Sequence, residues 1–151
     1  MKIRRSRALP EDRWPPLLLG GVRVLVVEDD DDQREFLVAL LGAAGAVVRS
    51  AAAGGEALAT LAWWRPAVLV SDLGLPDGDG YALLEAVRAQ HGADRLPAVA
   101  VTGQSAPADR RRALRAGFQA HLVKPADPDR LILVIAGLAR TGTPVAVEPA
   151  R

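Results

Sequence analysis

Five short apolar runs alternate along the chain with five longer segments of helical periodicity. The runs predict strands at residues 22–27, 47–50, 67–71, 98–102 and 120–123, and the periodic segments predict helices at 32–44, 55–64, 81–90, 106–116 and 128–139. Strands that are apolar on both sides are typical of a parallel sheet covered on both faces. The chain is therefore expected to fold as a doubly wound α/β domain around a five-stranded parallel sheet.

The composition is that of one globular domain. Half of the 151 residues are apolar and 25% are charged, which suffices for a core of ordinary size. The chain contains no cysteine, which fits a reducing compartment, and its apolar runs are too short to span a bilayer or to form a signal-peptide core. We therefore expect a cytoplasmic protein without a membrane partner. Residues 1–21 are interpreted as a basic, proline-containing arm or linker, 22–139 as the domain, and 140–151 as a flexible tail.

Positive charge is concentrated in two segments. Residues 1–19 hold five basic and two acidic side chains but no recognisable binding motif. Charged chain ends of this kind are more often solvated than bound to a partner, so no nucleic-acid partner is expected. The helix predicted at 106–116 contains the run DRRRALR, for which a solvated face and a docking surface are both open interpretations.

Polar side chains stand where four of the five predicted strands end. Glu28 and Asp29 follow the first strand, Asp72 follows the third, Thr102 ends the fourth and Lys124 follows the fifth. The carboxyl ends of parallel strands meet at one edge of a sheet. Carboxylates crowded at that edge repel one another unless a cation neutralises them, and oxygen ligands favour Mg²⁺. A hydroxyl and an ammonium group beside such a metal indicate a phosphoryl site with an aspartate as covalent acceptor.

The segments VLVVEDD, LVSDLGLPDGDG, AVTG and AHLVKP, in this order and spacing, resemble the receiver domain of two-component response regulators. The resemblance covers roughly residues 22–139 and implies a flavodoxin-like (βα)5 fold with strand order 2-1-3-4-5. It implies that Asp72 accepts a phosphoryl group from the phosphohistidine of a histidine kinase or histidine phosphotransfer protein. It also implies that Asp29 binds Mg²⁺ directly, that Glu28 acts mainly through a coordinated water, and that the carbonyl of Gly74 completes the protein ligands.

The same resemblance assigns further roles around the acceptor. Thr102 would bind a phosphoryl oxygen, and Lys124 would pair with the phosphoryl group. The peptide bond between Lys124 and Pro125 would be cis. His121 stands where the family places an aromatic switch residue, although a half-buried histidine without that role is an equal alternative. Gly74 and Gln104 would flank the path of the attacking water and so tune the lifetime of the phosphoryl group.

The segments DGYALLEAVRA and ALRAGFQAHLVKP are more similar to receivers at the C-terminus of hybrid histidine kinases than to those of transcription factors. Whether the domain is free-standing or part of such a kinase stays open, as does a homodimer. In either case the expected role is a phosphoacceptor module and not a turnover enzyme.

Two other classes of function each require a particular residue or motif that can be compared with this sequence. A phosphatase or phosphotransferase of the haloacid dehalogenase type needs a second aspartate two residues after the nucleophile, where this chain has Gly74. A dinucleotide-binding module needs a glycine-rich turn after the first strand, where EDDDD would repel a pyrophosphate.

Among these acids, Asp30, Asp31 and Asp32 are expected to cap the first helix or to favour its positive end. The segment DGDG at 77–80 is interpreted as a turn and not as a calcium loop.

Overall fold

The computed structural model describes residues 17–91, 96–103 and 106–141. Five parallel strands form one sheet in the order β2-β1-β3-β4-β5, which confirms the predicted fold and strand order. The strands are β1 (Arg23–Val27), β2 (Val47–Ala51), β3 (Val68–Ser71), β4 (Ala98–Thr102) and β5 (Ala120–Val123). The helices are α3 (Asp31–Ala43), α4 (Gly54–Leu61), α5 (Gly80–His91), α6 (Pro107–Ala116) and α7 (Pro128–Thr141).

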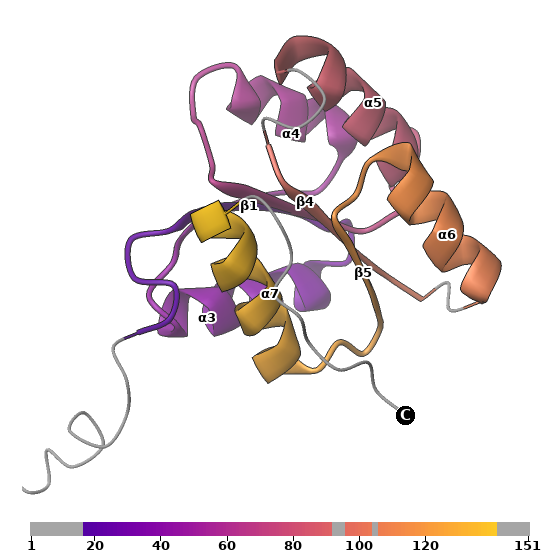
Figure 1. Cartoon of the computed structure of the whole chain (residues 1–151). Coiled ribbons are helices and arrows are strands. Elements are labelled where there is room, and N and C mark those ends of the chain that lie inside the picture. The colour runs from indigo at the N-terminus through magenta and orange to yellow at the C-terminus, as the bar shows by residue number, and fades with distance from the viewer. Residues whose placement is uncertain (1–16, 92–95, 104–105, 142–151) are drawn as a thin grey trace, which may run out of the picture.

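Helices cover both faces of the sheet. Helices α3 and α7 lie on one face, and α4, α5 and α6 lie on the other (Figure 1). Each face has its own apolar cluster, because alternate side chains of the central strands point to opposite sides. Strands β3 and β4 are buried along their whole length, whereas the edge strand β2 alternates exposed and partly buried residues. The central strands therefore read as continuous apolar runs in the sequence.

The helix boundaries lie within three residues of those predicted, and the largest difference has a local cause. The second helix ends at Leu61, although periodicity predicted it to reach Trp64. The chain turns after Leu61, where the amide of Trp63 donates to the carbonyl of Thr60 at 3.1 Å. Pro66 follows closely, and a residue that precedes a proline disfavours the helical conformation. Trp63 is consequently exposed, while Trp64 packs against the core.

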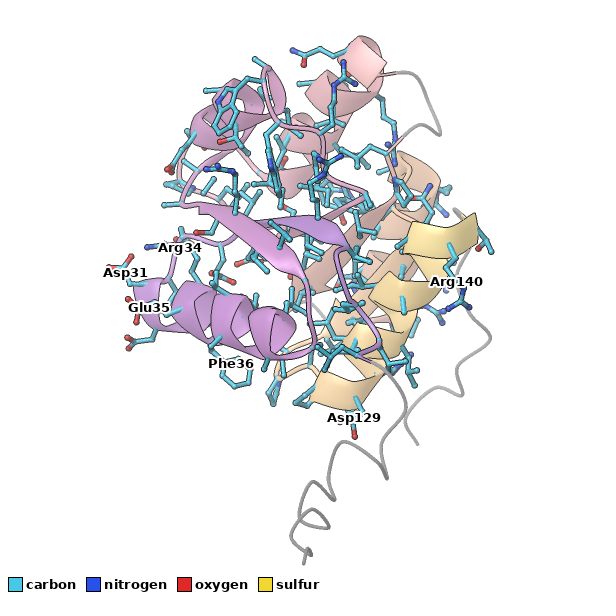
Figure 2. All side chains as sticks on the ribbon, turned by 90° about the vertical axis from the view of Figure 1, so that its left-hand side faces the viewer. Asp31, Arg34, Glu35, Phe36, Asp129 and Arg140 are labelled. Atoms are coloured by element: carbon cyan, nitrogen blue, oxygen red, sulfur yellow. The ribbon has the colours of Figure 1, made fainter. Side chains whose placement is uncertain are left out.

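The first helix begins as its acidic start predicts. Asp30 is the N-cap residue, and its carboxylate accepts a hydrogen bond from the amide of Gln33 at 2.9 Å. Asp31 and Asp32 lie in the first turn, next to the positive end of the helix. These caps fix the direction in which the chain leaves β1. Figure 2 shows the side chains of Asp31 and Glu35 of this helix pointing away from the sheet.

The segment before β1 contributes to the core. Leu19 is completely buried, and its amide donates to the carbonyl of Ala44 at 2.9 Å. The rest of the predicted arm, residues 1–16, and the tail from residue 142 lie outside the described residues. Within the described part of the chain, no helix is long and apolar enough to cross a membrane.

Arg88 on α5 connects three segments at the amino end of the sheet. Its guanidinium donates to the carbonyl of Leu96, to the carbonyl of Gly117 at 2.8 Å, and to the side chain of Gln119 at 3.3 Å. The same oxygen of Gln119 accepts the amide of Ala98, the first residue of β4, at 2.7 Å. One planar cation therefore satisfies backbone carbonyls in the segment before β4 and in the segment before β5.

Replacement of Arg88 by alanine should lower the free energy of unfolding by about 1–3 kcal/mol, because two partly buried carbonyl groups lose a charged donor. Urea denaturation measures the change. The matched control is Arg111→Ala, which removes an arginine exposed on α6. Arg88→Lys should recover only part of the loss, since an ammonium cannot reproduce the fork of the guanidinium. Equal stability of Arg88→Ala and Arg111→Ala would contradict this role.

Candidate functional site

Three carboxylates converge at the carboxyl edge of the sheet. Glu28 and Asp29 follow β1, and Asp72 follows β3. Strands β1 and β3 are neighbours whose last residues, Val27 and Ser71, are paired in register, so the residues that follow them also lie side by side. Ligand oxygens of the three acids all lie within 4.8 Å of one another. The adjacency that was expected from the strand ends is therefore present in the structure.

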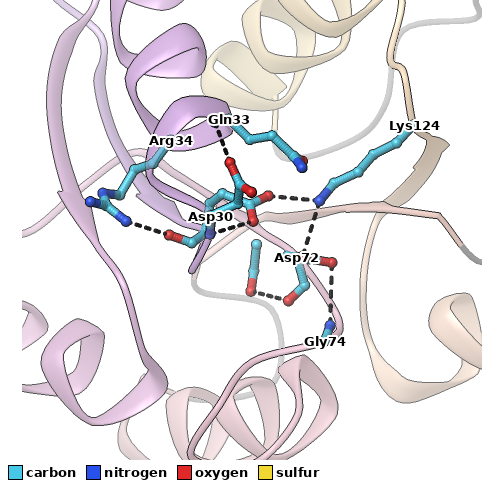
Figure 3. Close-up of polar contacts among 8 residues, drawn as sticks. Asp30, Gln33, Arg34, Asp72, Gly74 and Lys124 are labelled. Atoms are coloured by element: carbon cyan, nitrogen blue, oxygen red, sulfur yellow. Dashed lines mark hydrogen bonds and ion pairs between the residues drawn. The ribbon is translucent and has the colours of Figure 1, made fainter.

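Lys124 supplies the positive charge of this cluster. Its Nζ lies 2.7 Å from Oε1 of Glu28 and 3.0 Å from Oδ2 of Asp72 (Figure 3). The lysine follows β5, where its amide donates to the carbonyl of Thr102 at 2.8 Å and extends the pairing with β4. The peptide bond between Lys124 and Pro125 is cis, as predicted. The side chain thus joins the fifth strand to residues that follow the first and third.

Burial and the contacts between opposite charges have opposite effects on the pKa values of Glu28 and Lys124. Glu28 is 2% exposed, and this burial raises its pKa. The negative charge of Asp72 also raises it, whereas the hydrogen bonds from Lys124 and from the amide of Asp30 lower it; the net shift is upward. For Lys124, burial works to lower the pKa, but the contacts with Glu28 and Asp72 outweigh it, so the net shift is upward. The lysine therefore remains charged, while two of the three acids share it. Such a pocket retains an excess of negative charge that favours a cation.

Backbone groups hold the carboxylates in place. One oxygen of Asp72 accepts the amide of Gly74 at 3.2 Å, and one oxygen of Glu28 accepts the amide of Asp30 at 3.1 Å. Asp72 and Glu28 thus each hold one oxygen against a backbone amide and the other against Lys124. Gly74 reaches the site through its backbone, and its carbonyl as a metal ligand stays a prediction.

The remaining predicted residues have different surroundings. Thr102 is buried at the end of β4, next to the strand that carries Lys124. His121 is buried in β5, paired in register with Ala100 of β4. Gln104 lies outside the described residues. The structure therefore brings Thr102 to the same edge of the sheet as Asp72, and His121 lies on the neighbouring strand.

Arg34 takes part in the site although the sequence did not single it out. Its guanidinium donates to the backbone carbonyl of Glu28 at 3.0 Å and pairs with the carboxylate of Asp31 at 2.6 Å. It therefore fixes the turn between β1 and α3. The spacing of three residues between Asp31 and Arg34 on a helix was a signal for the ion pair. The hydrogen bond to the backbone carbonyl of Glu28 could not be predicted from a sequence pattern.

The donor set fits Mg²⁺. All three side chains offer carboxylate oxygens, the hard ligands that this ion prefers, and no sulfur or histidine nitrogen belongs to the cluster. Asp29 is exposed to solvent, so an ion held by it could keep several waters, as Mg²⁺ commonly does. Residues Glu28, Asp29 and Asp72 would hold the ion.

A hollow of about 690 Å³ lies between α3 and the start of α7. Lys124 forms part of its wall, and most of its other lining side chains are apolar, including Phe36, Leu40 and Leu131. Phe36 is 56% exposed and points away from the core (Figure 2). An apolar surface therefore adjoins the charged site.

The strand order and the acidic pocket at the sheet edge are those of a flavodoxin-like α/β domain with a candidate cation and phosphoryl site. The model of the response regulator receiver domain family matches residues 24–136, and the chain belongs to that family. It is therefore a receiver domain of two-component signalling.

The similarity extends to individual proteins. The chain is 42% identical over 80 residues to an uncharacterised 14.6 kDa protein of Leptolyngbya boryana, covering 53% of this chain and 61% of that protein. It is 36% identical over 87 residues to the response regulator Rre1 of Synechocystis, covering 54% of this chain and 38% of that protein. The solved structure of a putative response regulator from Chloroflexus aurantiacus has 34% identity and a TM-score of 0.74, covering 80% of this chain and 98% of that one.

The chain thus spans less than two thirds of these two curated relatives. Two of these three proteins bear the name response regulator, and none of the three supports the finer resemblance to the receivers of hybrid histidine kinases.

Asp29→Asn should lower the affinity for Mg²⁺ by about tenfold or more, because it removes a carboxylate ligand and not merely an outer partner. Calorimetry or the fluorescence of the tryptophans would measure the binding. Asp32→Asn is the matched control, since it removes the same charge from the first turn of α3, outside the cluster of three acids. Equal losses in both variants would mean that Asp29 acts only through long-range charge.

Proposed function

We propose that this receiver accepts a phosphoryl group on Asp72 from the phosphohistidine of a histidine kinase or histidine phosphotransfer protein, in a reaction that depends on Mg²⁺. The supporting observation is the position of the Asp72 carboxylate. It lies 3.0 Å from the Lys124 ammonium and within 4.8 Å of the carboxylate oxygens of Glu28 and Asp29. Its side chain is only 12% exposed, so it is shielded yet open to a donor at the sheet edge.

The transfer exchanges one bond to phosphorus for another. A carboxylate oxygen of Asp72 bonds to phosphorus while the bond from phosphorus to the imidazole nitrogen of the donor breaks, and the imidazole keeps that electron pair. Mg²⁺, when bound by the acidic cluster, supplies charge neutralisation for the phosphoryl oxygens. The Lys124 ammonium provides further positive charge, and the hydroxyl of Thr102 donates to a phosphoryl oxygen.

The phosphoryl group adds a charge of about −1.5 to −2 to a site that is already acidic. This charge shifts a pre-existing conformational equilibrium, with Thr102 and His121 as the moving parts. The domain signals by this shift or by onward transfer of the phosphoryl group. It acts in the cytoplasm as a phosphoacceptor and not as a turnover enzyme.

The apolar hollow beside Lys124 supports a protein donor and not a small molecule. A partner must bring its phosphohistidine to Asp72, and the exposed Phe36 offers an apolar contact close to that point. The proposal allows two arrangements: a free-standing receiver, or attachment to a hybrid histidine kinase, which the segments around α5 and α6 motivate. Homodimer formation is equally a proposal.

Asp72→Asn should abolish phosphoryl incorporation, because an amide cannot form the acyl phosphate. The protein is incubated with Mg²⁺ and a labelled phosphodonor, and the modified residue is located by mass spectrometry. Glu85→Gln, which removes an exposed carboxylate on α5, should incorporate the label like the unmodified protein. Beryllofluoride with Mg²⁺ should change the tryptophan fluorescence of the unmodified protein but not of Asp72→Asn. Persistent labelling of Asp72→Asn would move the acceptor to another residue.

Gly74→Met should slow the loss of phosphate by about threefold or more, because the longer side chain would shield phosphorus from water. A Cβ atom added at Gly74 meets no heavy atom within 4 Å, so the site has room for the substitution. Gln104→Ala should also slow the loss, since its amide can orient a water without acting as a base. The decay of isolated phosphoprotein in Mg²⁺ measures both effects. Gly42→Met adds the same side chain in open space on α3 and should leave the decay unchanged.

A further inference from the structure

Asp77 connects the loop that leaves the phosphoryl site to a different helix. The residue lies between Gly74 and the start of α5, and its carboxylate reaches the first turn of α4. One oxygen accepts the amide of Gly54 at 2.8 Å, and the other accepts the amide of Gly55 at 2.8 Å. These partners are 23 and 22 residues away in the sequence, so the contact is tertiary and not a local turn.

The contact replaces a cap that α4 lacks. The N-cap residue of this helix is Ala53, which offers no side-chain acceptor. The first amides of a helix have no partner within it, and its positive end favours an anion. The hydrogen bonds from Gly55 and Gly54 accordingly lower the pKa of Asp77. A Cβ atom at Gly55 would lie 3.2 Å from the carboxylate, which is tighter than ordinary contact and favours glycine there.

The loop between β3 and α5 is fastened at both ends. At its start, the amide of Gly74 donates to the carboxylate of Asp72. At its end, the amide of Gly80 donates to the carbonyl of Leu73 at 2.8 Å, and a Cβ atom at Gly80 would lie 2.5 Å from the carbonyl oxygen of Asp72. The backbone of Asp72 and Leu73 therefore packs directly against the first residue of α5. Between these ends, the carboxylate of Asp77 links the loop to α4.

We propose that Asp77 is a positioning residue for the phosphoryl site. By holding the loop against α4, it keeps the backbone of Gly74 next to the carboxylate of Asp72. Movement of the loop would withdraw the Gly74 amide from Asp72 and change the position of the Gly74 carbonyl, so both the acceptor and the metal site would be less well ordered. The consequence for Mg²⁺ rests on the proposed function, whereas the effect on the Gly74 amide does not.

Glu56 separates this role from simple stabilisation of α4. Its carboxylate accepts the amide of Ala52 at 2.7 Å, so it also stabilises the start of α4, from within the helix itself. Asp77 stabilises the same helix end and is itself part of the loop between β3 and α5. Glu56→Ala therefore weakens the helix end alone, and Asp77→Ala weakens the helix end and releases the loop.

The test compares Asp77→Ala, Asp77→Asn and Glu56→Ala in the full chain. Amide hydrogen exchange at Gly74 and Gly80 is measured without metal, and Mg²⁺ affinity is measured by calorimetry. Asp77→Ala should speed exchange at Gly74 and weaken Mg²⁺ binding, each by about threefold to tenfold, which is no more than the smallest loss usual for an outer partner of a metal site. Asp77→Asn should give values of both quantities between those of the unmodified protein and Asp77→Ala, because its amide oxygen can accept a hydrogen bond from one of the two helix amides.

Glu56→Ala should lower the melting temperature and leave Gly74 exchange and Mg²⁺ affinity unchanged. The proposal is overturned if Glu56→Ala changes both quantities as much as Asp77→Ala does, or if Asp77→Ala changes neither. Should Asp77→Ala fail to fold, Asp77→Asn carries the same comparison. Failure of the proposed function would appear separately, as phosphoryl labelling of Asp72→Asn with the exchange result intact.

Discussion

The central constraint on this molecule is the crowding of carboxylates at one edge of the sheet. Glu28 and Asp72 follow neighbouring strands and are largely withdrawn from water, so their charges repel strongly in the absence of a cation. Lys124 offsets part of that repulsion with a single ammonium group that contacts both acids. The unbalanced remainder favours a cation, and a bound cation would in turn favour the anionic phosphoryl group of the proposed function.

The rest of the fold serves to place these few groups accurately. The fully buried strands β3 and β4 are rigid because both faces are covered by helices. The turns that follow the strands are then fixed one by one, by Arg34 at the first and by Asp77 at the third. Fixed turns on a rigid sheet reduce the reorganisation that a charged reaction would otherwise need.

The sequence predicted the strands well, and it predicted that the strand-end acids and the lysine lie close together, because both depend on local pattern. Buried strands are continuous apolar runs, and strand ends collect at one edge, so this pattern alone was enough to place Asp29, Asp72 and Lys124 together. Arg88 and Asp77 could not be found in this way. Their partners are backbone groups on segments distant in sequence, and which backbone group a side chain reaches depends on how the helices and loops are finally packed.

The ion pairs of Lys124 span almost the whole domain. This lysine comes 96 residues after Glu28 and 52 residues after Asp72, so the site is complete only when the last strand has joined the sheet. A nascent chain that lacks its final strand and helix holds the acids without their counter-charge. Local opening of that final unit in the mature protein has the same effect. The charge balance of the site is thereby tied to the completeness of the fold, because the acids have their lysine contact only when the last strand is in place.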